Sequence, residues 1–269
     1  MKTINLKLYE LDRLKRFHPN TRFIGTESRL YLYPENNRLR IIKEIIDFNQ
    51  NKLITIKLLN QYKKEINIKE LILDNDILEI ESKKTGTVTD YIEGTILSNI
   101  IYDKNIQISY KIDLLKKIGA VLEKMKAFRN NGIESFYIGD LHEDNIIITN
   151  DNDIRILDMD SSKIMYNEPF PSKYLTRFAR RKKLENHLIT PNENTDNYCF
   201  NMMILNALFS KDISKLKIDD FYRHIDYLNS IGIDKNLINN FYSMYNNSSV
   251  LNLNNELDSL KKHDKIYLK

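Results

Sequence analysis

The sequence contains little cysteine, no long apolar run and almost no net charge. Its single cysteine, Cys199, excludes an intramolecular disulfide and a cysteine-rich zinc site, and it fits a reducing compartment such as the cytoplasm. No segment approaches the roughly eighteen apolar residues that a membrane span requires, and residues 1–17 lack the continuous apolar core of a secretory signal. We therefore expect a cytoplasmic protein that does not enter a membrane.

The charge balance gives little indication of a polyanionic partner. Lys and Arg total 41 and Asp and Glu total 37, so the net charge is +4 at pH 7. Without a localised basic patch, this small excess does not predict nucleic-acid binding. The 269 residues suffice for one large domain or for two lobes with a substantial buried core.

The most informative stretch of the chain reads YIGDLHEDNIIITNDNDIRILDMD. Runs of β-branched residues at 146–149 and 154–157 flank a turn-forming Asn-Asp-Asn-Asp segment, which predicts a β-hairpin. Because antiparallel pairing brings the outer ends of a hairpin together, Asn145 and Asp158 should face one point, with Asp140 a loop away. Oxygen ligands that converge beside a free carboxylate suit a Mg²⁺–nucleotide site. An Asn-rich hairpin with solvated side chains is the alternative.

This arrangement resembles the catalytic loop and the metal-binding strand of the protein-kinase-like superfamily. The resemblance implies that Asp140 is the catalytic residue that orients or deprotonates the acceptor hydroxyl, and that Asn145 and Asp158 bind Mg²⁺ on the phosphates of ATP. It also implies an α+β, two-lobed protein-kinase-like fold. Residues 1–92 would form a small antiparallel β N-lobe with five strands and a helix, and residues 93–269 a mainly helical C-lobe.

The segment before Lys43 is similar to the first strands of such an N-lobe. Strands are expected at Phe23-Ile24, 30–33 and 39–42, and residues 1–20 add a short helix or a further strand. The resemblance gives Lys43 a catalytic role in contacting the α- and β-phosphates. The family's phosphate loop has two or three glycines and this loop has one, so a plain hairpin turn is the alternative.

Residues 68–81 and 87–91 are predicted as two further strands, the second of which runs into the hinge between the lobes. Thr89 would guard the back of the nucleotide pocket, and backbone groups between Asp90 and Ile92 would receive adenine. A strand followed by a glycine turn is the alternative. The resemblance assigns cofactor contacts to Gly25, Thr26, Ser28, Lys43, Thr89, Asp90 and Ile92.

The apolar residues of 53–62 predict a helix with a broad buried face. In the family, this helix supplies a Glu that pairs with the strand lysine, but the alignment puts Thr55 at that position. Glu44 lies too early and Glu65 too late. Either another acid substitutes, or the enzyme is slow, or the chain is a nucleotide-binding pseudokinase.

The catalytic loop departs from the protein-kinase pattern in two places. Ile138-Gly139 precedes Asp140 without an Arg, which predicts activity that does not depend on activation-loop phosphorylation. The Gly-Asp-Leu-His run resembles small-molecule phosphotransferases such as the aminoglycoside and choline kinases. His142 is either a pH-sensitive catalytic contact to the γ-phosphate or a structural residue. The usual Asp-Phe-Gly is Asp158-Met159-Asp160 here.

Residues 161–194 correspond to the activation and substrate-binding segment of the family. Six basic residues within eleven positions form either a solvated surface or a docking site for an acidic or phosphorylated acceptor. They are Lys173, Arg177, Arg180, Arg181, Lys182 and Lys183.

The helical part of the chain is predicted from apolar spacing. The clearest helix covers 109–129, and a second covers 195–208, capped by Thr195 or Asp196. In the family, the acid at the position of Asp196 holds the backbone of the catalytic loop. Three further helices are expected near 214–229, 235–246 and 251–262.

The resemblance therefore implies an ATP- and Mg²⁺-dependent phosphotransferase, and it favours a Ser/Thr protein kinase of the bacterial or phage type acting on a protein acceptor. The spacing from Asp158 to Asp196 favours a protein acceptor. Gly139 and His142 favour a small-molecule phosphotransferase instead. Thr55 and the glycine-poor loop favour a non-catalytic nucleotide-binding regulator.

Overall fold

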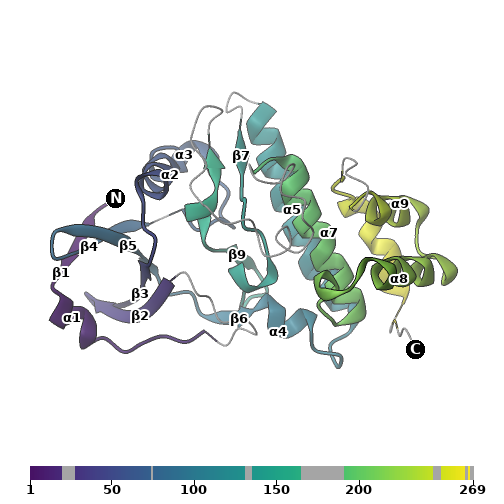
Figure 1. Cartoon of the computed structure of the whole chain (residues 1–269), viewed down its shortest axis with the longest axis horizontal. Helices are drawn as coiled ribbons and strands as arrows, with labels where there is room; N and C mark the ends of the chain where they lie inside the picture. Colours follow the sequence, from purple (N-terminus) through teal and green to yellow (C-terminus); the bar gives the residue numbers. More distant parts are fainter. Residues whose placement is uncertain are drawn as a thin grey trace.

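The computed structural model describes residues 1–19, 28–73, 75–130, 135–164, 191–244, 250–263 and 266. It is a mixed α/β structure in which an antiparallel-rich sheet lies on the N-terminal side and helices dominate the C-terminal side (Figure 1). The N-terminus lies beside the sheet, and α8 and α9 lie at the opposite end of the molecule (Figure 1).

The main sheet has five strands, which lie in the order β1 (Thr3–Leu6), β4 (Asp76–Ile80), β5 (Lys83–Asp90), β3 (Arg38–Ile45) and β2 (Ser28–Glu35). The pairs β2–β3, β3–β5 and β4–β5 are antiparallel, but β1 runs parallel to β4. The prediction of a purely antiparallel sheet is therefore wrong at this edge, because the N-terminal residues supply the fifth strand. Residues 1–20 form both structures considered for them, since α1 (Leu8–Asp12) follows β1. The strand expected at Phe23-Ile24 lies outside the described residues.

The two faces of this sheet carry different residues because side chains alternate along each strand. On one face, Ile42 and Val88 form a buried cluster with Leu11 of α1. Lys43 follows Ile42 and therefore lies on the opposite face, where its cross-strand partner is Thr87. The sheet thus presents one lysine to the interior of the molecule.

The helix α2 (Gln50–Gln61) covers the Lys43 face of the sheet. It begins three residues before the predicted helix at 53–62 because the side chain of Asn49 accepts the N–H of Lys52 and caps the first turn. Its apolar side packs on β4 in a cluster of Leu53, Ile56 and Ile77.

The segment predicted as one strand at 68–81 divides into two parts, and only its second part forms β4. In the first part, the N–H of Ile72 donates to the carbonyl of Ile156 at 3.0 Å, and the N–H of Ile156 donates to the carbonyl of Glu70 at 2.7 Å. This part leaves the main sheet because its apolar side chains are buried in the larger core on the helical side. They are Ile68, Leu71 and Leu73.

The predicted hairpin is confirmed as β8 (Ile146–Thr149) and β9 (Ile154–Ile156), which pair antiparallel. An additional strand, β6 (Gly94–Ile96), pairs with β8. A Cβ at Gly94 would lie 2.3 Å from the carbonyl oxygen of Ile148, so the close approach of β6 requires glycine. A separate two-stranded ribbon consists of β7 (Phe136–Tyr137) and β10 (Lys163–Ile164).

The helices of the C-terminal side agree closely with the apolar spacing. The predictions at 109–129 and 195–208 are confirmed as α5 (Ile108–Asn130) and α7 (Glu193–Phe209). Those at 214–229 and 235–246 correspond to α8 (Ile218–Ser230) and α9 (Lys235–Ser243). The third, at 251–262, is a 3₁₀ segment, η4 (Asn254–Lys262), rather than an α-helix. The remaining short helices are α3 (Lys63–Ile66), α4 (Leu97–Ile101), η1 (Glu143–Asn145), η2 (Met159–Ser161) and η3 (Ile213–Lys215).

The larger apolar core includes residues from both sides of the predicted boundary at residue 92. It joins α5, α7, α8, α9 and the hairpin with side chains from the end of α2 and from the stretch before β4. Two smaller clusters lie on the two faces of the main sheet. The main sheet is therefore fastened to the helical side by the chain between α2 and β4.

Candidate functional site

The loop that carries Asp140 is anchored to the first turn of α7. The buried carboxylate of Asp196 accepts the N–H of Ile138 at 2.9 Å and the N–H of Gly139 at 3.1 Å. Gly139 has φ +79°, and a Cβ there would lie 2.5 Å from the carbonyl oxygen of Ser161, so glycine is required twice over. Asp196 therefore does not cap α7 as considered from the sequence. Asn192 caps the helix by accepting the N–H of Thr195.

Asn145 closes the same loop from its other end. Its side-chain amide donates to the backbone carbonyl of Asp140 at 3.0 Å, and its backbone carbonyl accepts the N–H of Leu157 at 2.8 Å. The two ends of the hairpin therefore meet as predicted, next to Asp158. The amide nitrogen holds the loop, and the side-chain oxygen of Asn145 makes no hydrogen bond to another described residue.

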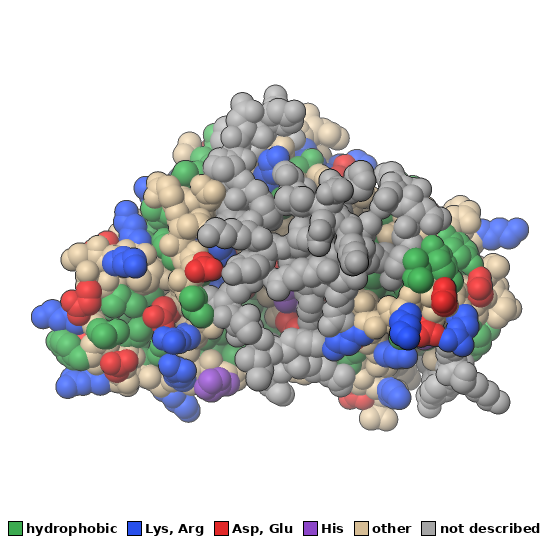
Figure 2. Space-filling model, in the orientation of Figure 1, with side chains coloured by type: hydrophobic (Ala, Val, Ile, Leu, Met, Phe, Trp, Pro, Cys, Tyr) green, Lys and Arg blue, Asp and Glu red, His purple; other side chains and the backbone are tan. Residues whose placement is uncertain are grey.

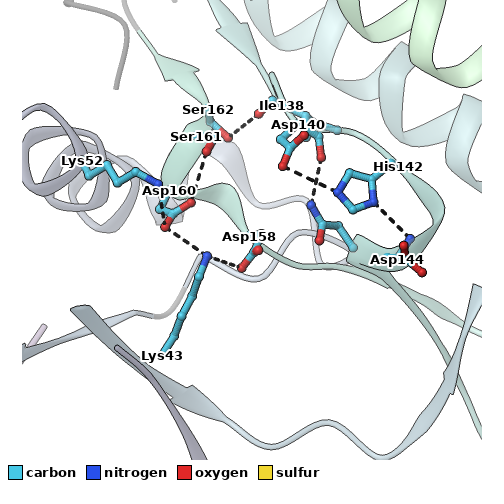
Figure 3. A network of polar contacts seen from close by, with 11 residues as sticks. Lys43, Lys52, Ile138, Asp140, His142, Asp144, Asp158, Asp160, Ser161 and Ser162 are labelled. Carbon is cyan, nitrogen blue, oxygen red and sulfur yellow. Dashed lines mark hydrogen bonds and ion pairs between the residues drawn. The ribbon is translucent and has the colours of Figure 1, made fainter. Parts of the chain in front are cut away.

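Lys43 reaches across from β3 to the chain that follows the hairpin (Figure 3). Its Nζ lies 2.7 Å from Oδ1 of Asp158 and 3.1 Å from Oδ2 of Asp160. Burial alone would lower the pKa of Lys43, but these two carboxylates raise it well above its ordinary value. Lys43 is thus held in its charged form and links the main sheet to the chain that follows the hairpin.

The two aspartates are not equivalent. Asp158 is 38% exposed and has φ 58°, a left-handed conformation that turns the chain sharply after β9. Asp160 is 7% exposed, and although burial alone would raise its pKa, Lys43 and Lys52 lower it overall. Asp158 therefore faces the open side of the site, and Asp160 faces the protein interior (Figure 3).

The helix α2 contributes a cation rather than a carboxylate. Its sequence contains no Asp or Glu, and Thr55 is fully buried within it. Lys52, one turn before Thr55, points its Nζ at Oδ2 of Asp160 at 3.6 Å. The other acids considered from the sequence lie elsewhere, since Glu44 contacts Arg29 and Tyr31 on the sheet and Glu65 is exposed on α3. The acids beside Lys43 are therefore Asp158 and, in η2, Asp160.

His142 lies beside Asp140. Its Nε2 is 3.6 Å from Oδ2 of Asp140, and its Nδ1 accepts the N–H of Asp144 at 3.2 Å. A ring nitrogen that accepts a hydrogen bond carries no proton, so neutral His142 has its proton on Nε2, directed toward Asp140. In this arrangement, His142 supports the carboxylate of Asp140 as well as closing the turn into η1.

The residues predicted to contact the nucleotide lie partly on the main sheet and partly outside the described residues. Ser28 begins β2 opposite Ile45, and Thr89 lies on β5 opposite Ile41, so both share the face of Lys43. The side chain of Asp90 is used by the sheet, where it lies 3.3 Å from Nε of Arg40. Ile92 follows β5 outside the strand. Gly25, Thr26 and the basic run at 173–183 lie outside the described residues.

Gly86 is a site residue that the sequence pattern does not single out. It lies on β5 opposite Glu44, and a Cβ there would lie 1.9 Å from the carbonyl oxygen of Lys43. Only glycine allows β3 and β5 to approach this closely beside Lys43. Asp160 and Lys52 are two further site residues that the sequence pattern does not single out. The extra acid two positions after Asp158 is the sequence feature that could have indicated them.

A metal at this site would depend on few protein ligands. Among the described residues, no group of three or more His, Cys, Asp or Glu side chains is arranged to hold a metal ion. Asn145 and Asp158 provide one amide and one carboxylate oxygen at the two adjoining ends of the hairpin. Mg²⁺ is commonly bound by one or two carboxylates together with phosphates and water, so this donor set fits Mg²⁺ on a nucleotide.

The rest of the described chain adds no membrane segment, because none of its helices is both long enough and apolar enough to cross a bilayer. A scan against models of known protein families finds none that matches the chain, and a search of the curated proteins finds no relative.

Proposed function

We propose that this chain is an ATP- and Mg²⁺-dependent phosphotransferase with a two-lobed, protein-kinase-like fold. The observation that carries the proposal is that Lys43, more than a hundred positions earlier in the sequence, contacts Asp158 at the end of the hairpin, where the amide of Asn145 holds the loop of Asp140. A buried carboxylate on α7 fixes the loop of Asp140 at the same time. A structural ion pair alone does not require a carboxylate that is 38% exposed at the end of the hairpin.

Each side chain has a definite task in the proposed reaction. Lys43 binds the α- and β-phosphates, and Asn145 and Asp158 would hold Mg²⁺, which neutralises charge on the phosphates. Asp140 orients the acceptor hydroxyl, whose oxygen bonds to the γ-phosphorus while the bond from that phosphorus to the bridging oxygen breaks. The hydroxyl proton passes to Asp140, and ADP leaves. Positioning and charge neutralisation supply most of the catalysis in such transfers.

The acceptor we favour is a Ser or Thr hydroxyl of a protein. The long basic segment between η2 and α7 supports this choice, since it suits an acidic or phosphorylated acceptor. On the face shown in Figure 2, acidic and basic side chains of the described residues are interspersed on both flanks, which does not favour a nucleic-acid partner.

Two alternatives have support of their own. The contact between His142 and Asp140, together with Gly139, favours a small-molecule phosphotransferase. The pairing of Lys43 with two aspartates and the absence of an acid from α2 favour a regulator that binds nucleotide without turnover.

The test is Mg²⁺-dependent transfer from γ-labelled ATP by the full chain, with and without a generic protein acceptor. We expect labelled protein with the wild type and a loss of roughly 10²–10⁴-fold in rate with Asp140→Asn, because the acceptor loses its general base. Asp158→Ala should abolish the Mg²⁺-dependent transfer itself, because Asp158 is a proposed ligand of the metal. Asp151→Asn is the matched control, since Asp151 is an exposed carboxylate of the hairpin turn and should leave the rate unchanged.

The outcomes separate the three functions. Label on the protein that is lost with Asp140→Asn supports a protein kinase. Transfer that occurs only when small hydroxyl compounds are added supports a small-molecule enzyme. Nucleotide binding without any transfer supports the regulator, and the absence of nucleotide binding contradicts the proposal as a whole.

A further inference from the structure

Three elements meet at the buried carboxylate of Asp160. Lys43 comes from β3 and lies 3.1 Å away, Lys52 comes from α2 and lies 3.6 Å away, and Asp160 itself belongs to η2. The hydroxyl of Ser161 donates to the other carboxylate oxygen at 3.4 Å. Figure 3 shows Asp160 between the ends of the two lysines.

The charges of this cluster balance. Two lysines face two aspartates, and the lysines and Asp160 are largely buried. Asp160 is the carboxylate that Lys52 reaches within the described part of the chain, whereas Lys43 has both Asp160 and the more exposed Asp158. If Asp158 turns to a metal ion, Lys43 retains Asp160, and Asp160 retains Lys52.

We propose that Asp160 is a positioning residue that fixes Lys43 against α2, and that Lys52 holds Asp160 in place for this purpose. The proposal rests on the function proposed above, in which Lys43 binds phosphate. The ion pair is reversed relative to the protein-kinase pattern, in which the helix supplies a Glu. Here α2 supplies the cation, Lys52, and the turn after Asp158 supplies the acid, Asp160. Asp158 is thereby left to act on the outer side without loosening α2.

The first measurement needs no nucleotide. The unliganded full chain is treated briefly with an amine-reactive label, and modification of individual lysines is measured by mass spectrometry. In the wild type, Lys43 and Lys52 should be modified far less than Lys69, which is 68% exposed. Asp160→Asn should raise modification of Lys43 and Lys52 severalfold, whereas Asp158→Asn, the matched control, should change both little because Lys43 retains Asp160. Unchanged modification of Lys43 in Asp160→Asn overturns the proposal.

The second measurement separates positioning from simple structural support. Asp160→Asn and Lys52→Met should each weaken binding of ATP about tenfold or more, and Lys52→Arg should restore it, because arginine keeps the ion pair. Asp160→Asn leaves the buried Lys52 without its carboxylate, and Lys52→Met removes one of the two cations beside the buried Asp160, so each single variant should lower the melting temperature. The double variant Asp160→Asn/Lys52→Met removes both charges, so its melting temperature should recover.

The double variant decides the matter. Recovered stability with ATP binding still weakened supports positioning of Lys43 by Asp160. Recovery of both stability and binding overturns it, because Asp160 and Lys52 would then serve packing alone. If the wild type itself binds no ATP, the proposed function fails, and the labelling experiment still tests the placement of Lys43 by Asp160.

Discussion

At the scale of single residues, the protonation of Asp196 makes stability depend on pH. It is buried, and burial raises its pKa to about 6, although the N–H groups of Ile138 and Gly139 act in the opposite direction. The acid that anchors the Asp140 loop is therefore protonated more readily in the folded chain than in the unfolded chain. This difference makes the free energy of unfolding depend on pH.

The sign of that dependence follows from the raised pKa. Stability from protonated Asp196 is fully present below about pH 4 and is lost as the pH rises to about 6, by about 3 kcal/mol for a shift of two pKa units. We expect the difference in unfolding free energy between wild type and Asp196→Asn to fall over this range and to be constant above about pH 7. Urea unfolding at several pH values measures it. A difference that does not change with pH would contradict the raised pKa.

Gly86 gives a second prediction at this scale. Gly86→Ala would drive a Cβ into the carbonyl oxygen of Lys43, so β3 and β5 must separate there. We expect the free energy of unfolding to fall by roughly 1–3 kcal/mol and ATP binding to weaken, because Lys43 shifts with its strand. Gly232→Ala is the control. Gly232 has φ +79° but no atom within 4 Å, so that change should lower stability by about 1 kcal/mol without affecting ATP binding.

The sequence indicates local parts of the site and misses the long-range parts. The β-branched runs on either side of the Asn-Asp-Asn-Asp turn predict the hairpin and the meeting of its ends at Asn145 and Asp158, because only neighbouring segments are involved. The partnership of Lys52 with Asp160 joins residues more than a hundred positions apart, and no local pattern specifies it. The roles of these residues in phosphate transfer stay predictions.

At the scale of elements, α7 and α9 are joined by buried asparagines rather than by apolar contact alone. The side chain of Asn240 donates to Oδ1 of Asn201 at 2.8 Å and to the carbonyl of Leu251 at 2.9 Å. Its own Oδ1 accepts the N–H of Leu251 at 2.8 Å. One side chain therefore satisfies groups on α7 and on the chain that follows α9.

We expect Asn240→Ala to lower the free energy of unfolding by roughly 2 kcal/mol or more, because it leaves Oδ1 of the buried Asn201 and the N–H of Leu251 without these partners. Asn239→Ala, at the neighbouring exposed position, should have little effect. Urea unfolding of the two variants provides the comparison. Equal stability of the two variants would mean that water replaces the lost bonds.

Elements were predictable where their own apolar spacing decides their burial. The spacing within α5 and α7 is long and regular, and both helices lie close to the predicted bounds. The stretch at 68–81 has the composition of a strand along its whole length, but its first half packs into the core of the helical side. The structure of each half depends on which apolar core it packs against, and this is decided by the folded chain rather than by the segment itself.

At the scale of the whole molecule, the apolar cores show how the sheet and the helices are connected. One large cluster extends from the end of α2 through the hairpin to η4, and the small clusters stay with the main sheet. The sequence predicted a sheet-rich first third and a helical remainder, as observed. It did not indicate the parallel edge strand β1, because pairing between residues 3–6 and 76–80 leaves no local pattern.

The pairing of residues 70–72 with Ile156 has a mechanical consequence. The two backbone hydrogen bonds at this point hold the chain just before β4 against the hairpin that carries Asn145 and Asp158. If the main sheet swings as a rigid body, this point serves as the pivot. β4 lies close to the pivot and would travel least, whereas β2, at the far edge, would sweep the widest arc. Lys43 on β3 would move by an intermediate amount, so a modest rotation would open or close its gap to Asp158.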